Sequence, residues 1–293
     1  MNNMRAYLKA TNGVFANVNF YLAWEAFNTM GYEVVLFEEK DIDTLDITPE
    51  TPVFAGVTIF KRIVDKLGVG YKPFDCYPEV LKPYYGRTLT KSTLGVEREK
   101  FHKDYKKVFV KPVLPKQFIG NVWESIINTI PLAKIPDDAE VWVCEPMDIL
   151  SEYRCYVLDG EILGVKHYYG DWSIAPPHKE YVERVIADYK GAPAAYGIDF
   201  AIIRRPKSWE NGMVNDDGFH EHPVVLEVND GCNLGNYGLD SIHYGEMIVS
   251  RWMEICKNKY RLSSPLVSDL QKRIVKDPFD EYDSKKVEQN TYT

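Results

Sequence analysis

Hydrophobic positions in the first third of the chain follow strand-like and helix-like patterns in alternation. Strands are predicted at residues 5–9, 32–37 and 53–55, and the second of them is a β-branched and aromatic run typical of a buried strand. Apolar side chains recur at helical spacing in residues 20–30 and 58–67. Strands and helices in this order predict a small α/β lobe with a parallel sheet.

Strand patterns dominate after a loop-like segment, residues 70–92, that is rich in Tyr, Pro and Gly. The predicted strands are residues 108–111, 141–145, 153–158, 161–168, 197–203 and 224–228. The pair Asp159-Gly160 between two alternating runs predicts a two-residue hairpin turn. One predicted helix interrupts the strands with an apolar stripe made of Trp123, Ile126, Ile127 and Ile130.

Two further helices are expected at residues 179–189 and 241–257, and a polar tail follows. The chain is therefore expected to be α/β with an α+β second part. Three regions are predicted: an N-terminal lobe (1–95), a larger domain (96–262) and a C-terminal tail (263–293).

Composition narrows the class of protein. A chain of 293 residues with 45% hydrophobic residues can bury a large core in more than one lobe. The net charge of −8 argues weakly against duplex nucleic acid as the main ligand without excluding it. Five cysteines without a C-x-x-C pair predict reduced thiols, and no apolar run reaches membrane-spanning length. A cytoplasmic location is expected.

Two lysines after residue 108 are candidate phosphate ligands. Lys111 ends a hydrophobic strand, so its ammonium could neutralise a phosphate at the strand mouth. Lys116 lies in the next loop, which could fold over a nucleotide. The alternative is that both lysines only reach solvent.

The strand of residues 141–145 ends in an acid and a proline, which is typical of a hinge. Backbone groups there could pair with an adenine edge, and Asp148 could reach ribose hydroxyls. In the following hairpin, Arg154 and Lys166 occupy equivalent places on adjacent strands. Two opposed cations repel unless an anion lies between them, so they predict a polyphosphate or acid. The alternative is that both side chains project to solvent from an exposed sheet face.

Two apolar strands carry oxygen-bearing side chains. Asp199 is embedded in one of them, and Glu227 and Asn229 lie two residues apart in the other, hence on one face. Adjacent strands could bring the three together as ligands for Mg²⁺ bound to nucleotide phosphates. The alternative is a set of carboxylates satisfied by arginine or by backbone donors.

The order of these segments resembles the ATP-grasp superfamily. A Lys-Pro strand end, an acidic hinge, a hairpin with Arg and Lys, Gly-Ile-Asp-Phe and Leu-Glu-Val-Asn-Asp carry the resemblance, roughly over residues 108–254. One arginine and two lysines suggest a small clade found in bacteria and phages. The resemblance implies an ATP-grasp domain of two α+β subdomains after an N-terminal α/β lobe.

The resemblance also implies residue roles. Lys111 would contact the α- or β-phosphate of ATP. Backbone groups of the hinge, at Cys144, Glu145 and Met147, would read adenine, and Asp148 would hold the ribose. Asp199, Glu227 and Asn229 would coordinate Mg²⁺. Arg154 and Lys166 would neutralise the γ-phosphate and an acyl phosphate. The glycine- and serine-rich lid loop of the family is not evident, which leaves the role of Lys116 in doubt.

The resemblance implies an ATP-dependent ligase that activates a carboxylate as an acyl phosphate and joins it to an amine or similar nucleophile, releasing ADP. The carboxylate could belong to a small molecule, a peptide or a protein. Substrate contacts are expected from the segment that contains Tyr84, Tyr85 and Arg87. Two alternatives remain: a kinase or nucleotidyl-transferring enzyme on the same scaffold, and an ATP-binding protein without turnover.

Other constellations are weaker. His220 and His222 flank Glu221 in a polar segment that could bind a metal adventitiously, although a solvated loop is the simpler interpretation. Cys232 has no histidine at a defined spacing that would activate it as a nucleophile. Phosphate-loop, nucleophile-elbow and protein-kinase motifs are absent from the sequence.

Overall fold

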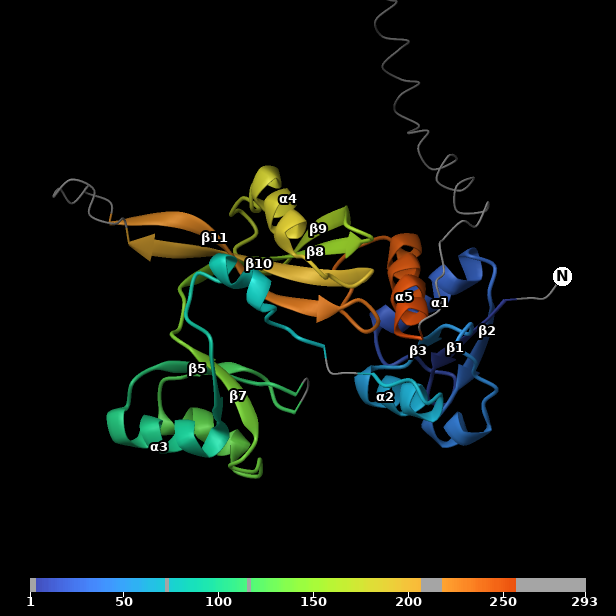
Figure 1. Ribbon diagram of the computed structural model, residues 1–293, viewed down its shortest axis with the longest axis horizontal. Helices are drawn as coiled ribbons and strands as arrows, with labels where there is room; N and C mark the ends of the chain where they lie inside the picture. Colours follow the sequence, from blue (N-terminus) through green and yellow to red (C-terminus); the bar gives the residue numbers. More distant parts are fainter. Residues whose placement is uncertain (1–3, 72–73, 115–116, 207–217, 257–293) are drawn as a thin grey trace, which may run out of the picture. The chain divides into compact units, whose positions relative to one another are not determined.

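The computed structural model describes residues 4–71, 74–114, 117–206 and 218–256 (Figure 1). Its contacts divide the chain into two compact units. Of the described residues, one unit holds 4–71 together with 240–256, and the other holds those from 74 to 239. The boundaries expected after residues 95 and 262 stay a prediction, and the tail 263–293 lies outside the described residues.

The first unit is built on a three-stranded parallel sheet in the order β2-β1-β3, as the hydrophobic pattern predicts. Its strands are β1 (Arg5–Lys9), β2 (Glu33–Phe37) and β3 (Val53–Phe54). Its helices are α1 (Val18–Thr29), the 3₁₀ helix η1 (Glu39–Thr44), α2 (Val57–Lys66) and α5 (Ser241–Ile255). In α1, the Asn17 side chain accepts from the backbone N–H of Asn19, which caps the helix.

Helix α5 packs on α1 through a close contact at Gly245. A Cβ added there would lie 2.5 Å from the Cβ of Ala26 on α1. Beyond that contact, Trp252 of α5 is fully buried and its indole N–H donates to the Pro49 carbonyl at 2.9 Å. A small residue at position 245 therefore sets how closely the two helices approach.

The second unit contains two four-stranded antiparallel sheets. One has the order β4-β7-β5-β6, and the other has the order β11-β10-β8-β9. The strands of the first are β4 (Thr90–Thr93), β5 (Val108–Pro112), β6 (Asn121–Trp123) and β7 (Glu140–Cys144). The strands of the second are β8 (Ile149–Leu158), β9 (Glu161–Gly170), β10 (Ala195–Pro206) and β11 (Phe219–Asp230).

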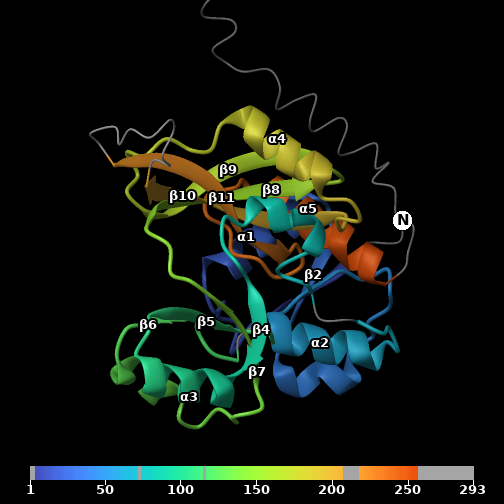
Figure 2. The same ribbon diagram turned by 60° about the vertical axis from the view of Figure 1, so that its left-hand side comes forward.

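Helices cover each of these sheets. Figures 1 and 2 show α3 (Leu94–Asp104) against the first sheet and α4 (Lys179–Asp188) along the second. Two 3₁₀ helices, η2 (Glu79–Tyr84) and η3 (Ile126–Leu132), complete the unit. Asp159 and Gly160 both have positive φ, 48° and 85°, so the predicted tight hairpin turn joins β8 to β9. No helix among the described residues is long and apolar enough to cross a membrane.

One predicted helix is wrong. Trp123 ends strand β6 and is buried, but the residues after it form the 3₁₀ helix η3. A 3₁₀ helix has three residues per turn, so the α-helical spacing of the three isoleucines no longer defines one buried face. Ile127 and Ile130 are 69% and 62% exposed.

We predict that Gly245→Ala destabilises the first unit. Alanine has the higher helix propensity, by roughly 1 kcal/mol. The clash with Ala26 should outweigh this gain and cost about 1–3 kcal/mol. Urea unfolding measures the difference. Ser250→Ala, on the same helix, is the control and should be nearly neutral; a stabilised Gly245→Ala protein would contradict the packing argument.

Candidate nucleotide and metal site

The candidate site is organised by an irregularity in strand β11. Asp199 of β10 pairs with Glu227 of β11. The next residue of β10, Phe200, pairs with Val225, so Leu226 is an extra residue in β11. Such a β-bulge places two consecutive side chains on one face of the strand. Leu226 and Glu227 accordingly line one pocket, whereas Val225 packs in the core on the opposite face.

Four charged side chains form a row across the second sheet. The strand register places them opposite one another on neighbouring strands in the order Glu227, Asp199, Arg154 and Lys166. Opposed residues of an antiparallel pair have Cβ atoms about 4.5–5.5 Å apart. The two cations therefore lie on adjacent strands as the sequence predicts, and Asp199 lies between Arg154 and Glu227.

Arg154 and Asp199 form a buried ion pair with two hydrogen bonds. Nε and Nη2 of Arg154 donate to the two carboxylate oxygens of Asp199, each at 2.7 Å. The side chains are 7% and 2% exposed. Burial by itself lowers the pKa of Arg154, but the Asp199 carboxylate outweighs burial and raises that pKa. Asp199 therefore supplies the anion that Arg154 requires.

Asn229 links the two carboxylates. Its Nδ2 donates to Oδ2 of Asp199 at 3.0 Å and to Oε1 of Glu227 at 3.4 Å. The Asp199 and Glu227 carboxylates thus both lie within hydrogen-bond distance of one atom of Asn229, and the three side chains predicted as metal ligands converge. Because amide oxygen and nitrogen are assigned from the hydrogen bonds, Asn229 can also present its oxygen to this point.

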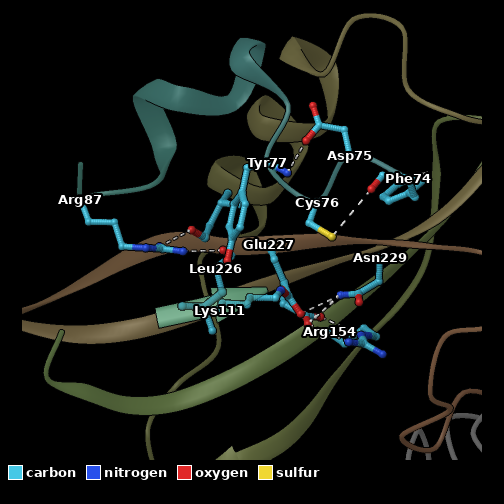
Figure 3. Close-up of polar contacts among 12 residues, drawn as sticks. Phe74, Asp75, Cys76, Tyr77, Arg87, Lys111, Arg154, Leu226, Glu227 and Asn229 are labelled. Atoms are coloured by element: carbon cyan, nitrogen blue, oxygen red, sulfur yellow. Dashed lines mark hydrogen bonds and ion pairs between the residues drawn. The ribbon is translucent and has the colours of Figure 1, made fainter. Parts of the chain in front are cut away.

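Lys111 of β5 lies against the same group from the other sheet. Its ammonium forms an ion pair with Glu227, and the two side chains are 20% and 24% exposed. The Nζ atom lies 5.2 Å from the ring centroid of Tyr77. Burial lowers the pKa of Lys111, and the nearby Cys76 and Asp199 oppose that shift. Figure 3 shows Lys111, Glu227, Asn229 and Arg154 gathered in one place.

A pocket of about 320 Å³ opens beside this cluster. Both sheets of the second unit line it, with Phe109, Lys111 and Val122 from one and Ile149, Glu152, Tyr168, Leu226 and Glu227 from the other. The connecting segment adds Cys144, Glu145, Pro146 and Met147. A mostly apolar cleft with a few convergent polar groups is the usual form of a small-molecule site.

The predicted hinge residues divide into two groups. Cys144, Glu145 and Met147 line the pocket, and the Glu145 carboxylate accepts from the backbone N–H of Thr88 at 3.1 Å. Asp148 does not line it; its carboxylate forms an exposed ion pair with Arg204 at 3.4 Å. The ribose role of Asp148 stays a prediction.

Three residues around Arg154 are not predicted from the sequence. Glu152 lines the pocket, and burial raises the pKa of its carboxyl group. Tyr168 also lines the pocket and stacks on Tyr237, with ring centroids 4.7 Å apart. The guanidinium carbon of Arg154 lies 4.9 Å from the Tyr237 centroid and 5.7 Å from that of Tyr168. For these three residues, the one signal in the sequence is that Glu152 lies two positions before Arg154 on β8, which places both side chains on one face.

A loop after β11 is hydrogen-bonded to Arg154. The Gly235 carbonyl accepts from Nη1 of Arg154 at 3.3 Å and from the Tyr156 hydroxyl at 2.9 Å. The Tyr156 hydroxyl in turn accepts from the Tyr237 backbone N–H at 2.9 Å. A Cβ on Gly235 would lie 3.2 Å from the Tyr237 ring, so a larger residue in this turn would push the ring by a few tenths of an ångström.

The remaining candidates lie apart from this cluster or outside the described residues. Lys166 is half-buried at the end of the charged row and has no ion-pair partner in the part of the chain that the structure describes. Lys116 lies outside that part. Cys232 is 2% exposed. The rings of His220 and His222 are 6.0 Å apart.

The side chains of Asp199, Glu227 and Asn229 fit a hard divalent cation. Among the described residues no group of three His, Cys, Asp or Glu side chains could hold a metal ion. The predicted set instead combines two carboxylates with one amide, which are oxygen donors of the kind that Mg²⁺ prefers. The Lys111 ammonium lies against Glu227, where the field of the carboxylates favours a cation.

Comparison with known proteins agrees with this geometry. Residues 84–247, more than half of the chain, match the model of an ATP-grasp domain, the second family of the clade that is marked by one arginine and two lysines. The chain therefore belongs to the ATP-grasp superfamily. None of the curated protein sequences matches it.

Solved structures show the same fold at low sequence identity. The D-alanine–D-alanine ligase from Bacillus anthracis complexed with ATP is 16% identical, with a TM-score of 0.52 over 89% of this chain and 100% of the ligase chain. The N5-carboxyaminoimidazole synthetase from Staphylococcus aureus is 12% identical, with a TM-score of 0.53 over 85% of this chain and 77% of the synthetase chain.

We predict that Lys111→Met tightens the binding of Mn²⁺ added without nucleotide. The substitution frees Glu227 from its ammonium partner and makes the site more negative. Hydrogen bonds to charged groups are worth about 1.5–3 kcal/mol, which corresponds to a gain of about tenfold or more. Electron paramagnetic resonance of free Mn²⁺ measures the affinity. Lys107→Met, which breaks the exposed pair with Glu124, is the control and should change nothing.

Proposed function

We propose that the chain is an ATP-dependent ligase that converts a carboxylate into an acyl phosphate and transfers the acyl group to an amine or similar nucleophile. The observation that carries the proposal is the cluster in which Lys111, Glu227, Asn229 and Arg154 meet (Figure 3). Two of its members, Lys111 and Glu227, line the pocket. This arrangement supplies cations for phosphate and oxygen ligands for a metal at one end of an apolar cleft.

The adenosine part of ATP would occupy the apolar end of the pocket. Phe109, Val122 and Leu226 offer apolar surface to a purine, and the backbone from Cys144 to Met147 offers hydrogen-bonding groups at its edge. Glu152 also lines the pocket, as do Met147 and Ile149. We therefore assign Glu152 as a ribose ligand to be tested beside Asp148.

The triphosphate would lie toward the charged row. Lys111 would exchange its contact with Glu227 for a phosphate oxygen, and Arg154 and Lys166 would face the γ-phosphate. Asp199, Glu227 and Asn229 would hold Mg²⁺. When bound, this ion neutralises phosphate charge and aligns the phosphates for transfer.

The reaction then has two steps. A carboxylate oxygen of the substrate attacks the γ-phosphorus, the bond to the β-phosphate oxygen breaks, and ADP leaves. The nucleophile attacks the acyl carbon, loses its proton and displaces inorganic phosphate. The chain's part is to align the reactants and to neutralise the charge that develops on the transferred group.

Products separate this function from its alternatives. With ATP, Mg²⁺ and pooled amino acids and peptides, we expect ADP and phosphate in equal amounts. Hydroxylamine, a substitute nucleophile, should trap the acyl phosphate as a hydroxamate. AMP would indicate nucleotidyl transfer, and a stable phosphorylated product would indicate a kinase. Tight ATP binding without any turnover would indicate a binding protein.

Glu227→Gln should lower this turnover by about a hundredfold or more, because a neutral amide holds a divalent cation and the charge of the transition state poorly. Circular dichroism should show an unchanged fold. Glu221→Gln, an exposed acid on the same strand, is the matched control and should keep full activity. Equal activity of the two variants would remove Glu227 from the metal site.

Two further variants test the ribose ligand. If Glu152 contacts the ribose, Glu152→Gln should weaken ATP binding by about tenfold, because hydrogen bonds to a charged acceptor are worth about 1.5–3 kcal/mol. Asp148→Asn should have little effect. Isothermal titration with ATP and with 2′,3′-dideoxy-ATP compares them, and the analogue should bind the two variants and the unmodified protein alike. The opposite ranking would assign the ribose to Asp148.

A further inference from the structure

Strand β11 is an edge strand, and its outward backbone groups are covered by the segment from Phe74 to Arg87. The order β11-β10-β8-β9 leaves one side of β11 without a neighbouring strand. On that side the Val228 N–H donates to the Cys76 carbonyl at 3.0 Å. This bond secures the strand immediately after Glu227.

The Arg87 guanidinium covers the carbonyls immediately before Glu227. Its Nη1 donates to the Val225 carbonyl at 3.1 Å and to the Tyr85 carbonyl at 3.1 Å. Its Nη2 donates to the Leu226 carbonyl at 2.6 Å. Figure 3 shows Arg87 reaching toward Leu226 while Lys111 lies at Glu227. Leu226 is the extra residue of the bulge and Val225 is the paired residue before it, so one side chain binds the carbonyls at the start of the bulge.

The loop that carries Arg87 approaches β11 closely because residue 86 is glycine. A Cβ at Gly86, whose φ is +63°, would lie 2.4 Å from Cγ1 of Val224. The Gly86 carbonyl also accepts from Nη2 of Arg205 on β10 at 2.6 Å. Both features hold the loop where the guanidinium meets the bulge.

The Tyr77 ring lies between the charged groups of Arg87 and Lys111. Its ring centroid lies 5.7 Å from Cζ of Arg87 and 5.2 Å from Nζ of Lys111. The Arg87 charge is thus held by carbonyl dipoles and an aromatic face, while Lys111 contacts Glu227. This division leaves Lys111 as the cation available to an incoming phosphate.

We propose that Arg87 is a positioning residue that fixes the β11 bulge and thereby aims Glu227 at the metal. The inference rests on the proposed function, in which Glu227 is a metal ligand. Without the bulge, Leu226 and Glu227 could not share a face, so a relaxed bulge would turn Glu227 away from Asp199 and Asn229.

Mn²⁺ binding in the presence of a non-hydrolysable ATP analogue tests the proposal. Substitution of residues that orient metal ligands typically costs about 10–100-fold in metal affinity, and we expect Arg87→Ala to fall in this range. Guanidinium ion should restore part of the loss. Arg87→Lys should remain weak, because an ammonium cannot reproduce the two-pronged contact.

Arg98→Ala is the matched control. Arg98 also donates to backbone carbonyls, those of Leu132 and Ile135. It lies in helix α3, against the other sheet of the unit, and does not line the pocket. Its loss should lower thermal stability and leave Mn²⁺ affinity unchanged. If both variants lose Mn²⁺ affinity equally, the effect is general destabilisation and the proposal fails.

A second measurement separates positioning from direct contact with nucleotide. ATP binding in excess EDTA should be the same for Arg87→Ala as for the unmodified protein; a loss there would mean that Arg87 binds phosphate itself and would overturn the proposal. If the unmodified protein binds no Mn²⁺ even with the analogue, the proposed function fails. If it binds Mn²⁺ and Arg87→Ala binds equally well, only the positioning role fails.

Discussion

The ion pair between Arg154 and Asp199 is the constraint around which the second unit is arranged. Removing two charges from water is costly unless geometry and further hydrogen bonds compensate. Both conditions are met, because the guanidinium binds both carboxylate oxygens and also donates to the Gly235 carbonyl. The pair fixes the register of β8 against β10, and Gly197 opposite it leaves room for the arginine stem. The register of the neighbouring strands places Glu227 and Lys166 at the two ends of the charged row.

The charges of the site are largely balanced within the chain. Arg154 offsets Asp199, and Lys111 offsets Glu227. In the proposed function, a triphosphate and a divalent cation would enter the site together as an exchange of partners: the phosphates would pair with the cations, and the metal with the carboxylates. Entry of either one alone would leave buried charge uncompensated. The same balance accounts for a buried arginine and a half-buried lysine beside an otherwise apolar cleft.

The sequence predicts most of the fold because its signals are local. Alternation and the Asp159-Gly160 turn identify the strands and the β8–β9 hairpin, and alternation places Glu227 and Asn229 on one face. The bulge at Leu226 escapes prediction because nothing in β11 itself signals an extra residue; it depends on the register with β10 and on an arginine 139 positions away. The segment of Arg87, predicted as a loop with substrate contacts, also covers an edge strand. Its substrate contacts stay a prediction. The partners of Lys111 and Arg154 also come from distant strands, which local patterns do not encode.

With 12–16% identity to ligases of the same fold, this chain shares with them an architecture more than a set of side chains. Features specific to this chain should therefore lie in the loops beside the pocket. Tyr168 lines the pocket, stacks on Tyr237, and through it adjoins the turn at Gly235 that also binds Arg154. A substrate that displaced the 43% exposed Tyr237 would disturb Arg154 directly, since ring, carbonyl and guanidinium are in mutual contact. In the proposed function, binding of the acceptor would then also move Arg154, the side chain that would align the γ-phosphate. Acceptor selection and phosphate alignment would therefore be coupled.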